Sequence, residues 1–370
     1  MTAQRLLMTA DAVGGVWTYA LDLARGLVPH GFETVLVVCG PSPDDGQSRD
    51  AAAIPGLRLV DTGLPLDWTA RTADEIGAAG AAIGDIARRV GADLVHLNSP
   101  GLAPELAFDG PVVGVCHSCV KTWWKAVKPG ELPPDLAWRA ETHHRGMALC
   151  DAVVAPSAAF AGATAAAYRV PPPYVVHNGR NRSDEARLSG RQPIVFTSGR
   201  LWDEGKNVAV LDAAAGKAGV EVVAAGPVSG PNGAALPPVR HLNLLGPLSQ
   251  DGIRGWLGRA GIYASSALYE PFGLGVLEAA QAGCALVLSE IPTFRELWGG
   301  AAIFVDPRRP NEFAAAFECL LRNEREAAYL GNLARERARR FSVERMAAGM
   351  AEAYAEMLAV SAHPPREAAA

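Results

Sequence analysis

The stretch PIVFTSGRLWDEGKN, residues 193–207, joins an apolar run that is typical of a buried strand to a loop with glycines and two cations. It nearly matches the phosphate-binding P-loop, which needs Gly, four residues, and then Gly-Lys before Ser or Thr. Here five residues separate Gly199 from Gly205, and Asn207 replaces the hydroxyl side chain that would bind magnesium. The loop therefore belongs either to an altered nucleotide triphosphatase or to a site that binds a diphosphate in another way.

Similar apolar runs lie on both sides of this stretch and alternate with helical segments. Strands that are buried on both faces of a sheet form continuous apolar runs, and helices between them imply parallel crossover connections. Seven runs come first: RLLMTA (5–10), TVLVVCG (34–40), LRLVD (57–61), DLVHLN (93–98), PVVGVCH (111–117), DAVVAPS (151–157) and PYVVHN (173–178). After a polar, arginine-rich break at 178–192 with the composition of a linker, six follow: PIVFTSG (193–199), VEVVAAG (220–226), HLNLLG (241–246), GIYASS (261–266), ALVLSE (285–290) and AAIFVD (301–306). The sequence therefore predicts an α/β protein with two Rossmann-like, doubly wound parallel-sheet domains that face each other across a cleft.

Composition and charge argue against several classes of protein. Of the 370 residues, 49% are hydrophobic and 20% are charged, which is ordinary for a protein that buries a large core. The net charge of −5 argues against a general nucleic-acid binder, which needs a basic face for phosphates. No apolar run approaches the roughly 18 residues of a membrane span, and the N-terminal MTAQRLLMTA is more typical of a first strand than of a signal peptide. We therefore expect a cytoplasmic enzyme with no transmembrane segment and no nucleic-acid partner.

The cysteines and carboxylates give little support for a metal centre. Of six cysteines, Cys116 and Cys119 form a C-x-x-C pair around His117. A zinc site usually needs a second pair of ligands at similar spacing, and the sequence has none. Asp-x-Asp occurs nowhere in the chain. We therefore expect buried thiols, no cofactor and metal-independent chemistry, with a metal or redox role for C-x-x-C as the alternative.

Ligands of open parallel sheets bind beyond the carboxyl ends of the strands, so the loops there are candidate sites. Gly14 and Gly15 follow the first run, where glycine lets the backbone approach a ligand at the start of a helix. A simple tight turn is the alternative, because the Gly-x-Gly-x-x-Gly dinucleotide fingerprint is missing. His117 ends the fifth run, and this position favours a functional histidine over a structural one.

The loop HSCVKTWWKAVKPGELPP, residues 117–134, gathers most of the lysine in the chain. The sequence has five lysines against 29 arginines, and three of the five are Lys121, Lys125 and Lys128. They lie beside Trp123 and Trp124, and aromatic rings with cations suit a sugar or an anionic acceptor. Lys121, Trp123 and Trp124 are therefore candidate acceptor-binding residues. A solvated basic loop that covers the cleft explains the pattern equally well.

The stretch SSALYEPFGLGVLEAAQAG, residues 265–283, runs from the end of a strand into a helix. Pro271 and Gly273 mark the start of the helix, so the amide donors of its first turn should point to the cleft. Glu270 and Glu278 are eight residues apart on the two sides of this start. Two glutamates at that spacing mean little by themselves, but their place in a strand-end loop and its helix indicates a binding site.

These motifs together resemble the retaining glycosyltransferases of family 4, which have the GT-B fold. EPFGLGVLE (270–278) resembles the Glu-x7-Glu signature of the family, and SGRLWDEGKN (198–207) resembles its Gly-Arg-Leu…Lys segment. Further likenesses lie in YVVHNGRN (174–181), AAGP (224–227) and LGPLSQDGIRGWLGRAGIYASS (245–266). The resemblance spans nearly the whole chain, and Gly14, Gly15 and His117 fit it as well.

The resemblance implies a role for each candidate residue. Arg200 and Lys206 would bind the diphosphate of a nucleotide sugar, where a planar fork and a compact charge stabilise the leaving group. Glu278 would bind the ribose hydroxyls, and His117 would contact the donor sugar. Glu270 would hold the same sugar, helped by backbone amides. The implied catalytic residues are His117, Arg200, Lys206 and Glu270. The other donor-binding residues are Gly14, Gly15, Gly226, Leu248, Phe272, Gly273, Leu274 and Glu278, with Gly14 and Gly15 near the diphosphate or the acceptor.

Two departures from the family pattern affect these roles. The segment before Lys206 is one residue longer than the common spacing, so the loop could bulge and move Lys206. Arg180 and Asn181 stand where an aliphatic residue and an aspartate are common, which changes the expected surroundings of the hinge.

The resemblance also implies the division of the chain and the reaction. We expect an acceptor-side domain at 1–185, a nucleotide-sugar-binding domain at 186–340, and at 341–370 a helix that returns to the N-terminal domain with a tail. A UDP- or GDP-linked sugar would be transferred, with retention of anomeric configuration, to a sugar, lipid-linked or small-molecule acceptor. The alternatives are a non-catalytic nucleotide-sugar or glycan-binding protein, and an epimerase or hydrolase of nucleotide sugars.

Overall fold

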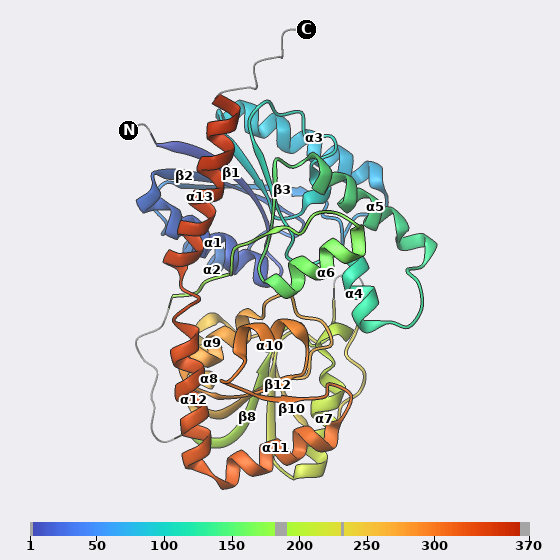
Figure 1. The fold of residues 1–370 in the computed structure, drawn as a ribbon, viewed down its shortest axis with the longest axis vertical. Coiled ribbons are helices and arrows are strands. Elements are labelled where there is room, and N and C mark those ends of the chain that lie inside the picture. The colour runs from blue at the N-terminus through green and yellow to red at the C-terminus, as the bar shows by residue number, and fades with distance from the viewer. Residues whose placement is uncertain (1–2, 182–190, 231–232, 363–370) are drawn as a thin grey trace.

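The computed structural model describes residues 3–181, 191–230 and 233–362, in which the chain forms two parallel sheets (Figure 1). The N-terminal sheet has the strand order β3-β2-β1-β4-β5-β6-β7, with β1 (Gln4–Asp11), β2 (Phe32–Cys39), β3 (Leu57–Leu64), β4 (Leu94–Leu97), β5 (Val112–Val115), β6 (Ala152–Ala155) and β7 (Tyr174–Val175). The C-terminal sheet has the order β10-β9-β8-β11-β12-β13, with β8 (Gln192–Ser198), β9 (Glu221–Ala225), β10 (Leu242–Gly246), β11 (Ala260–Ser265), β12 (Ala285–Ser289) and β13 (Ile303–Val305). Each apolar run of the sequence overlaps one of these strands, and the prediction of two doubly wound domains is confirmed.

Helices cover both faces of each sheet. The N-terminal part of the chain forms α1 (Gly15–Leu27), α2 (Asp45–Ala52), α3 (Ala73–Val90), α4 (Val120–Val127), α5 (Pro134–Leu149) and α6 (Ala158–Tyr168). The rest forms α7 (Val208–Ala218), α8 (Gln250–Arg259), α9 (Leu274–Ala282), α10 (Pro292–Trp298), α11 (Pro310–Arg322), α12 (Glu324–Ala338) and α13 (Val343–Ala362). Successive strand residues enter different cores, as Leu6 and Leu7 do, because side chains alternate between the two faces of a sheet. No helix of the described residues is long and apolar enough to cross a membrane.

The strand order of each sheet defines where a ligand can bind. The chain order reverses beside β1 in the first sheet and beside β8 in the second. Connections on the two sides of such a point leave in opposite directions and open a crevice at the carboxyl ends of the strands. The loop with Gly14 follows β1, and the loop with Gly199 follows β8, so both glycine loops lie at these points. Of the expected linker at 178–192, residues 182–190 lie outside the described part.

The last helix packs on the N-terminal domain although it follows the whole C-terminal sheet. Figure 1 shows α13 running beside α1, while α12 lies on the other domain. Met346, Ala347, Met350 and Tyr354 of α13 are buried in the same apolar cluster as the strands β1 and β2. Helix α13 therefore supplies part of the N-terminal core.

The close approach of α1 and α13 predicts a large effect of one methyl group. A Cβ atom on Gly26 would lie 2.7 Å from Cβ of Ala347 and 2.8 Å from Cγ1 of Val343. We expect Gly26→Ala to lower the free energy of unfolding by about 1–3 kcal/mol, because overpacking forces the two helices apart. Urea unfolding followed by circular dichroism measures this change.

Gly162 provides the matched control, since it lies within α6 with open space around its Cα. Gly162→Ala should raise stability by about 0.5–1 kcal/mol, the usual gain from replacing glycine in a helix. Equal effects of the two substitutions would contradict the tight packing of α13.

Candidate active site

A cavity of about 500 Å³ lies between the two sheets at the carboxyl ends of their strands. Its lining includes loops that follow β1, β3, β4 and β5 in one domain and β8, β9, β10 and β11 in the other. Twelve of the residues singled out from the sequence line it: Gly14, Gly15, His117, Arg200, Lys206, Gly226, Leu248, Glu270, Phe272, Gly273, Leu274 and Glu278. The structure therefore brings together residues that lie far apart in the chain.

Two helices direct their N-termini at this cavity, one from each domain. Helix α1 begins after Gly14, which has φ 104°, and α9 begins after Gly273, which has φ 93°. Within the described residues, neither start has a side-chain cap or an acidic residue in its first turn. The first N–H groups of a helix lack intrahelical partners and carry a positive partial charge. The two starts can therefore both bind an anion.

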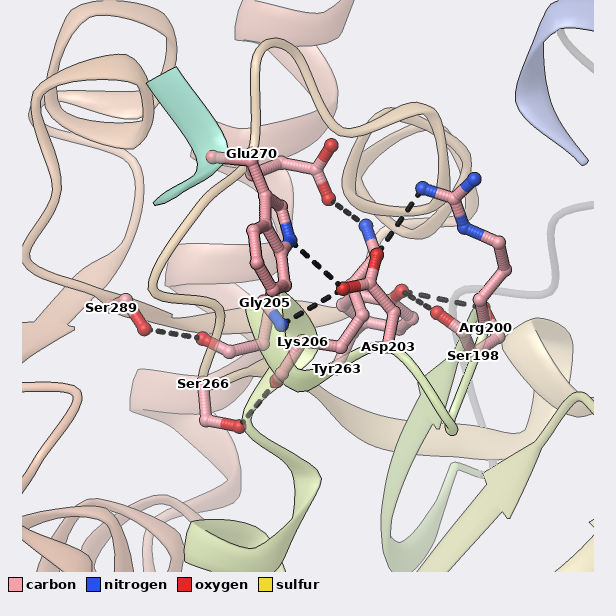
Figure 2. Close-up of polar contacts among 11 residues, drawn as sticks. Ser198, Arg200, Asp203, Gly205, Lys206, Tyr263, Ser266, Glu270 and Ser289 are labelled. Carbon is pink, nitrogen blue, oxygen red and sulfur yellow. Dashed lines mark hydrogen bonds and ion pairs between the residues drawn. The ribbon is translucent and has the colours of Figure 1, made fainter. Parts of the chain in front are cut away.

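The loop after β8 holds the two cations that the sequence predicted. Asp203 accepts a hydrogen bond from the Arg200 guanidinium at 3.2 Å and another from the Gly205 N–H at 2.9 Å. A short 3-10 helix, η3 (Glu204–Lys206), then turns the chain so that Nζ of Lys206 forms an ion pair with Glu270. Figure 2 shows Arg200 and Lys206 on the two sides of Asp203. The longer spacing before Lys206 is thus compatible with its place in the cavity.

Asn207 explains how this loop differs from a P-loop. Its backbone has φ 54°, a left-handed conformation that asparagine tolerates better than most residues. Its side-chain amide donates to the carbonyl oxygens of Ser266 at 3.0 Å and Pro307 at 2.7 Å. The hydroxyl of Ser266 in turn donates to the carbonyl oxygen of Asn207 at 2.9 Å. Asn207 therefore joins the loop to the end of β11 and does not point toward a phosphate-bound metal.

Hydrogen bonds hold the side chain of His117 in the lining of the cavity. Nε2 of His117 lies 2.7 Å from Oδ1 of Asn98, and Nε2 of His96 lies 2.8 Å from the same oxygen. Because the Asn98 amide nitrogen donates to the carbonyl of Thr9, its oxygen is the acceptor, so both histidines donate through Nε2. Burial and the neighbouring His96 lower the pKa of His117 to about 3. The imidazole is thus neutral at physiological pH, and its Nδ1 can accept a hydrogen bond from a ligand.

Glu278 is paired with Arg180, which crosses from one domain to the other. The Arg180 guanidinium lies 2.7 Å from Oδ2 of Asp22 on α1 and 2.8 Å from Oε1 of Glu278 on α9. The side chains of Arg180, Asp22 and Glu278 are 16%, 8% and 18% exposed. Burial raises the pKa of Glu278, and Arg180 opposes that rise. The residue that replaces an aliphatic side chain in the family pattern therefore favours the ionised form of a nearly buried carboxylate.

The three acceptor candidates do not reach the cavity. Residues 120–127, expected as part of a loop, form helix α4, and none of Lys121, Trp123 and Trp124 lines the cavity. The indole N–H of Trp123 instead donates to Asp203 at 3.2 Å, and Nζ of Lys121 lies over the ring of Tyr168. Acceptor binding by these residues stays a prediction: in the structure the amphipathic helix α4 turns Trp123 toward the other domain and Lys121 toward α6.

Several cavity residues had no role in the sequence prediction. Asp11 is the last residue of β1, Asn98 follows β4, and Tyr269 precedes Glu270. Their positions after predicted strands could have indicated them. Asp67 and Trp68 lie beyond the end of β3, in a loop without a motif, and gave no such signal.

The C-x-x-C pair lies behind the cavity in an apolar cluster. Cys116 and Cys119 are both buried, and Sγ of Cys116 lies 3.3 Å from Nε2 of His143. Burial raises the pKa of the Cys116 thiol well above its ordinary value. In the part of the chain that the structure describes, no group of three His, Cys, Asp or Glu residues is arranged to hold a metal ion.

Comparisons with known proteins agree with this arrangement. The chain shares its fold with sucrose-phosphate synthase from Thermosynechococcus elongatus, at a TM-score of 0.77 and 19% identity, over 96% of this chain and 100% of the other. It is similar to a glycosyltransferase from Rickettsia africae, with a TM-score of 0.70, 16% identity, and coverage of 97% and 99%. It is also similar to Anabaena HepE in complex with UDP-glucose, with a TM-score of 0.69, 16% identity, and coverage of 95% and 99%. Among curated proteins, no sequence matches significantly.

The two facing domains and the shared cavity define a glycosyltransferase of the GT-B class. The profile described as Glycosyltransferase Family 4 matches residues 13–184, and that of Glycosyl transferases group 1 matches residues 192–323. Together the two profiles cover most of the chain, which is therefore a glycosyltransferase of the family 4 and group 1 type.

Proposed function

We propose that the protein transfers a sugar from a nucleoside-diphosphate donor, linked to UDP or GDP, to an acceptor with retention of anomeric configuration. One observation carries this proposal: Arg200, Lys206 and two uncapped helix starts converge on one cavity within the described residues. Such a concentration of positive charge matches a diphosphate, whose negative charge increases as it leaves. HepE, a relative in fold, was solved in complex with UDP-glucose, which supports a nucleotide sugar as the donor.

The donor would lie mainly against the C-terminal domain. Glu278 faces the cavity as an acceptor for ribose hydroxyls, with one oxygen already fixed by Arg180. Glu270 would bind hydroxyls of the sugar, and the diphosphate would compete with Glu270 for Lys206. Neutral His117 would accept a hydrogen bond from the sugar through Nδ1. We assign the donor half to residues 186–340 and the acceptor half to residues 1–185.

Retention would follow from attack on the face that the diphosphate leaves. The bond between the anomeric carbon and the phosphate oxygen breaks, the acceptor oxygen bonds to that carbon, and the acceptor proton passes to the departing phosphate. A double displacement would need a free carboxylate nucleophile beside the sugar. Glu270 suits that role poorly because in the proposed complex it binds hydroxyls of the sugar.

The proposal is tested by incubating the protein with UDP- and GDP-sugars and measuring nucleotide release with and without acceptors. Proton NMR of the first product then gives the anomeric configuration before it equilibrates. Release of UDP or GDP with the configuration of the donor supports the proposal. An inverted product, an epimerised nucleotide sugar or no nucleotide release from any donor contradicts it.

Donor turnover should survive thorough treatment with EDTA. Arg200, Lys206 and the helix starts supply the positive charge that a metal ion supplies in other transferases. We expect less than about a twofold change in rate, because no electrostatic group of the site would be removed. Complete loss of turnover that manganese or magnesium restores would overturn this prediction.

A further inference from the structure

The wall that the N-terminal domain contributes to the cavity carries two carboxylates, Asp11 and Asp67. The cationic side chains among the described lining residues are Arg200 and Lys206, and both belong to the opposite domain. Among the described lining residues, His117 is the basic group on the N-terminal wall, and it is neutral because burial lowers its pKa to about 3. Within the part of the lining that the structure describes, the acceptor half of the cavity therefore carries carboxylates without a cation of its own, whereas the donor half carries both cations together with Asp203, Glu270 and Glu278.

Neighbouring groups hold both carboxylates at the edge of the cavity. Oδ1 of Asp11 accepts the N–H of Val13 at 2.8 Å, and Asp11 interacts across the cavity with Arg200. The loop that carries Asp67 is fixed by Arg139 of α5, whose guanidinium donates to the carbonyls of Asp67 and Ala70 at 2.8 Å each. Burial raises the pKa of Asp11 to about 6, and the neighbouring Asp67 carboxylate adds to that rise.

Trp68 gives the same wall an apolar face. It follows Asp67 directly, is partly buried, and lines the cavity. A tryptophan ring stacks well on the apolar face of a sugar, while carboxylates accept hydrogen bonds from the hydroxyls at its rim. The wall therefore combines the two groups that suit a sugar ring or another cyclic polyol.

We propose that the acceptor is an uncharged polyol, such as a sugar with free hydroxyls, which binds to Asp11, Asp67 and Trp68, and that phosphorylated acceptors are excluded. This inference rests on the proposed function and specifies the substrate class of its acceptor side. The name of sucrose-phosphate synthase, a relative in fold, indicates a phosphorylated product for that protein, whereas we propose an unphosphorylated acceptor for this chain.

The physical reason is the balance of charge around the acceptor. A phosphate on this wall would face two carboxylates, and like charges placed together cost several kcal/mol. Arg200 and Lys206 cannot compensate, because in the proposed complex they bind the diphosphate of the donor. The lysines at 121–128 do not compensate either, since none of them lines the cavity: Lys121 lies over Tyr168, Lys125 is exposed, and Lys128 is paired with Glu204 at 2.5 Å.

Matched acceptor pairs test the proposal with whichever nucleotide sugar shows the fastest nucleotide release without acceptor. The pairs are glucose and glucose 6-phosphate, fructose and fructose 6-phosphate, and glycerol and glycerol 3-phosphate, each followed by product formation. Within each pair that the enzyme accepts, we expect kcat/KM for the neutral acceptor to exceed kcat/KM for the phosphorylated acceptor by at least about tenfold. A like-charge penalty of one to several kcal/mol corresponds to a factor of this size or larger. Preference for a phosphorylated member, or transfer to none of the acceptors while nucleotide release continues, would overturn the proposal.

Two variants connect the preference to the wall. Asp67→Asn should raise the KM of the acceptor substrate by about fivefold or more, because a charged group that accepts hydrogen bonds from the sugar hydroxyls is lost. The KM of the donor should change by less than this. Asp61→Asn is the control, since Asp61 lies exposed on β3 outside the cavity, and both constants should stay as in the parent. Equal increases in the two KM values for Asp67→Asn would contradict an acceptor role. Absence of nucleotide release from every donor would instead refute the proposed function itself.

Discussion

Replacing Arg200 by alanine is expected to lower donor turnover by about 100-fold, the usual loss when one preorganised electrostatic donor is removed. Arg200 lines the cavity and is held by Asp203, so in the proposed complex it would face the diphosphate without rearrangement. Its side chain is 44% exposed, and its removal should therefore leave the fold intact. Steady-state nucleotide release, measured beside the melting temperature, separates the two effects.

Arg322→Ala is the matched control for this prediction. Arg322 lies exposed on α11 of the same domain, pairs only with partly exposed Glu318 among its described ion pairs, and is outside the cavity. Its turnover should equal that of the parent protein. Arg200→Lys should be intermediate, because it keeps the charge and loses the planar fork. Parental turnover in Arg200→Ala would exclude Arg200 from the site.

Replacing Arg180 by leucine is expected to lower the free energy of unfolding by about 3–5 kcal/mol, because it leaves the nearly buried Glu278 without its ion-pair partner and Asp22 with only the more exposed Arg25. Asp22 and Glu278 are nearly buried, and the leucine side chain can neutralise neither. The difference in unfolding free energy between the parent protein and Arg180→Leu should become smaller as the pH falls. Burial already raises the pKa of Glu278, and without Arg180 this pKa would rise further. The loss of stability therefore applies above the ordinary glutamate pKa, where the carboxyl is ionised in the unfolded chain. It disappears at a pH low enough to protonate the group in both states. Urea unfolding at two pH values measures both effects.

Arg25 offers the control for the Arg180 substitution. It contacts the same Asp22 carboxylate at 3.1 Å from the solvent side, with its own side chain 44% exposed. Arg25→Leu should cost less than about 1 kcal/mol, as exposed ion pairs do. If Arg180→Leu costs no more than Arg25→Leu, the crossing ion pairs do not hold the domains together.

The sequence predicted the strands well because their burial is continuous. A parallel strand between two helical layers needs apolar residues on both faces, and runs such as PIVFTSG (193–199) show this directly. The sequence prediction treated residues 117–134 as a loop because it relied on their lysine and tryptophan content, and it therefore missed helix α4. Trp123 and the lysines around it suggested a ligand surface, whereas their helical spacing places Trp123 against Asp203 of the other domain.

The cavity residues were predicted unevenly for a physical reason. Arg200, Lys206, Glu270 and Glu278 lie in stretches whose local order resembles a known family, so each could be assigned without a structure. The partner of Glu278 could not, because Arg180 reaches it from the other side of the linker. Asp67 was also missed, since its position depends on how Arg139 holds an irregular loop.

The packing of α13 on α1 has a consequence for protein synthesis. Helix α1 leaves the ribosome early, whereas the helix that completes its core is translated after the entire second domain. At ordinary elongation rates the delay is on the order of tens of seconds. During that interval the nascent N-terminal domain exposes the apolar surface that Met346, Met350 and Tyr354 later cover, and this surface is where a chaperone would bind the growing chain.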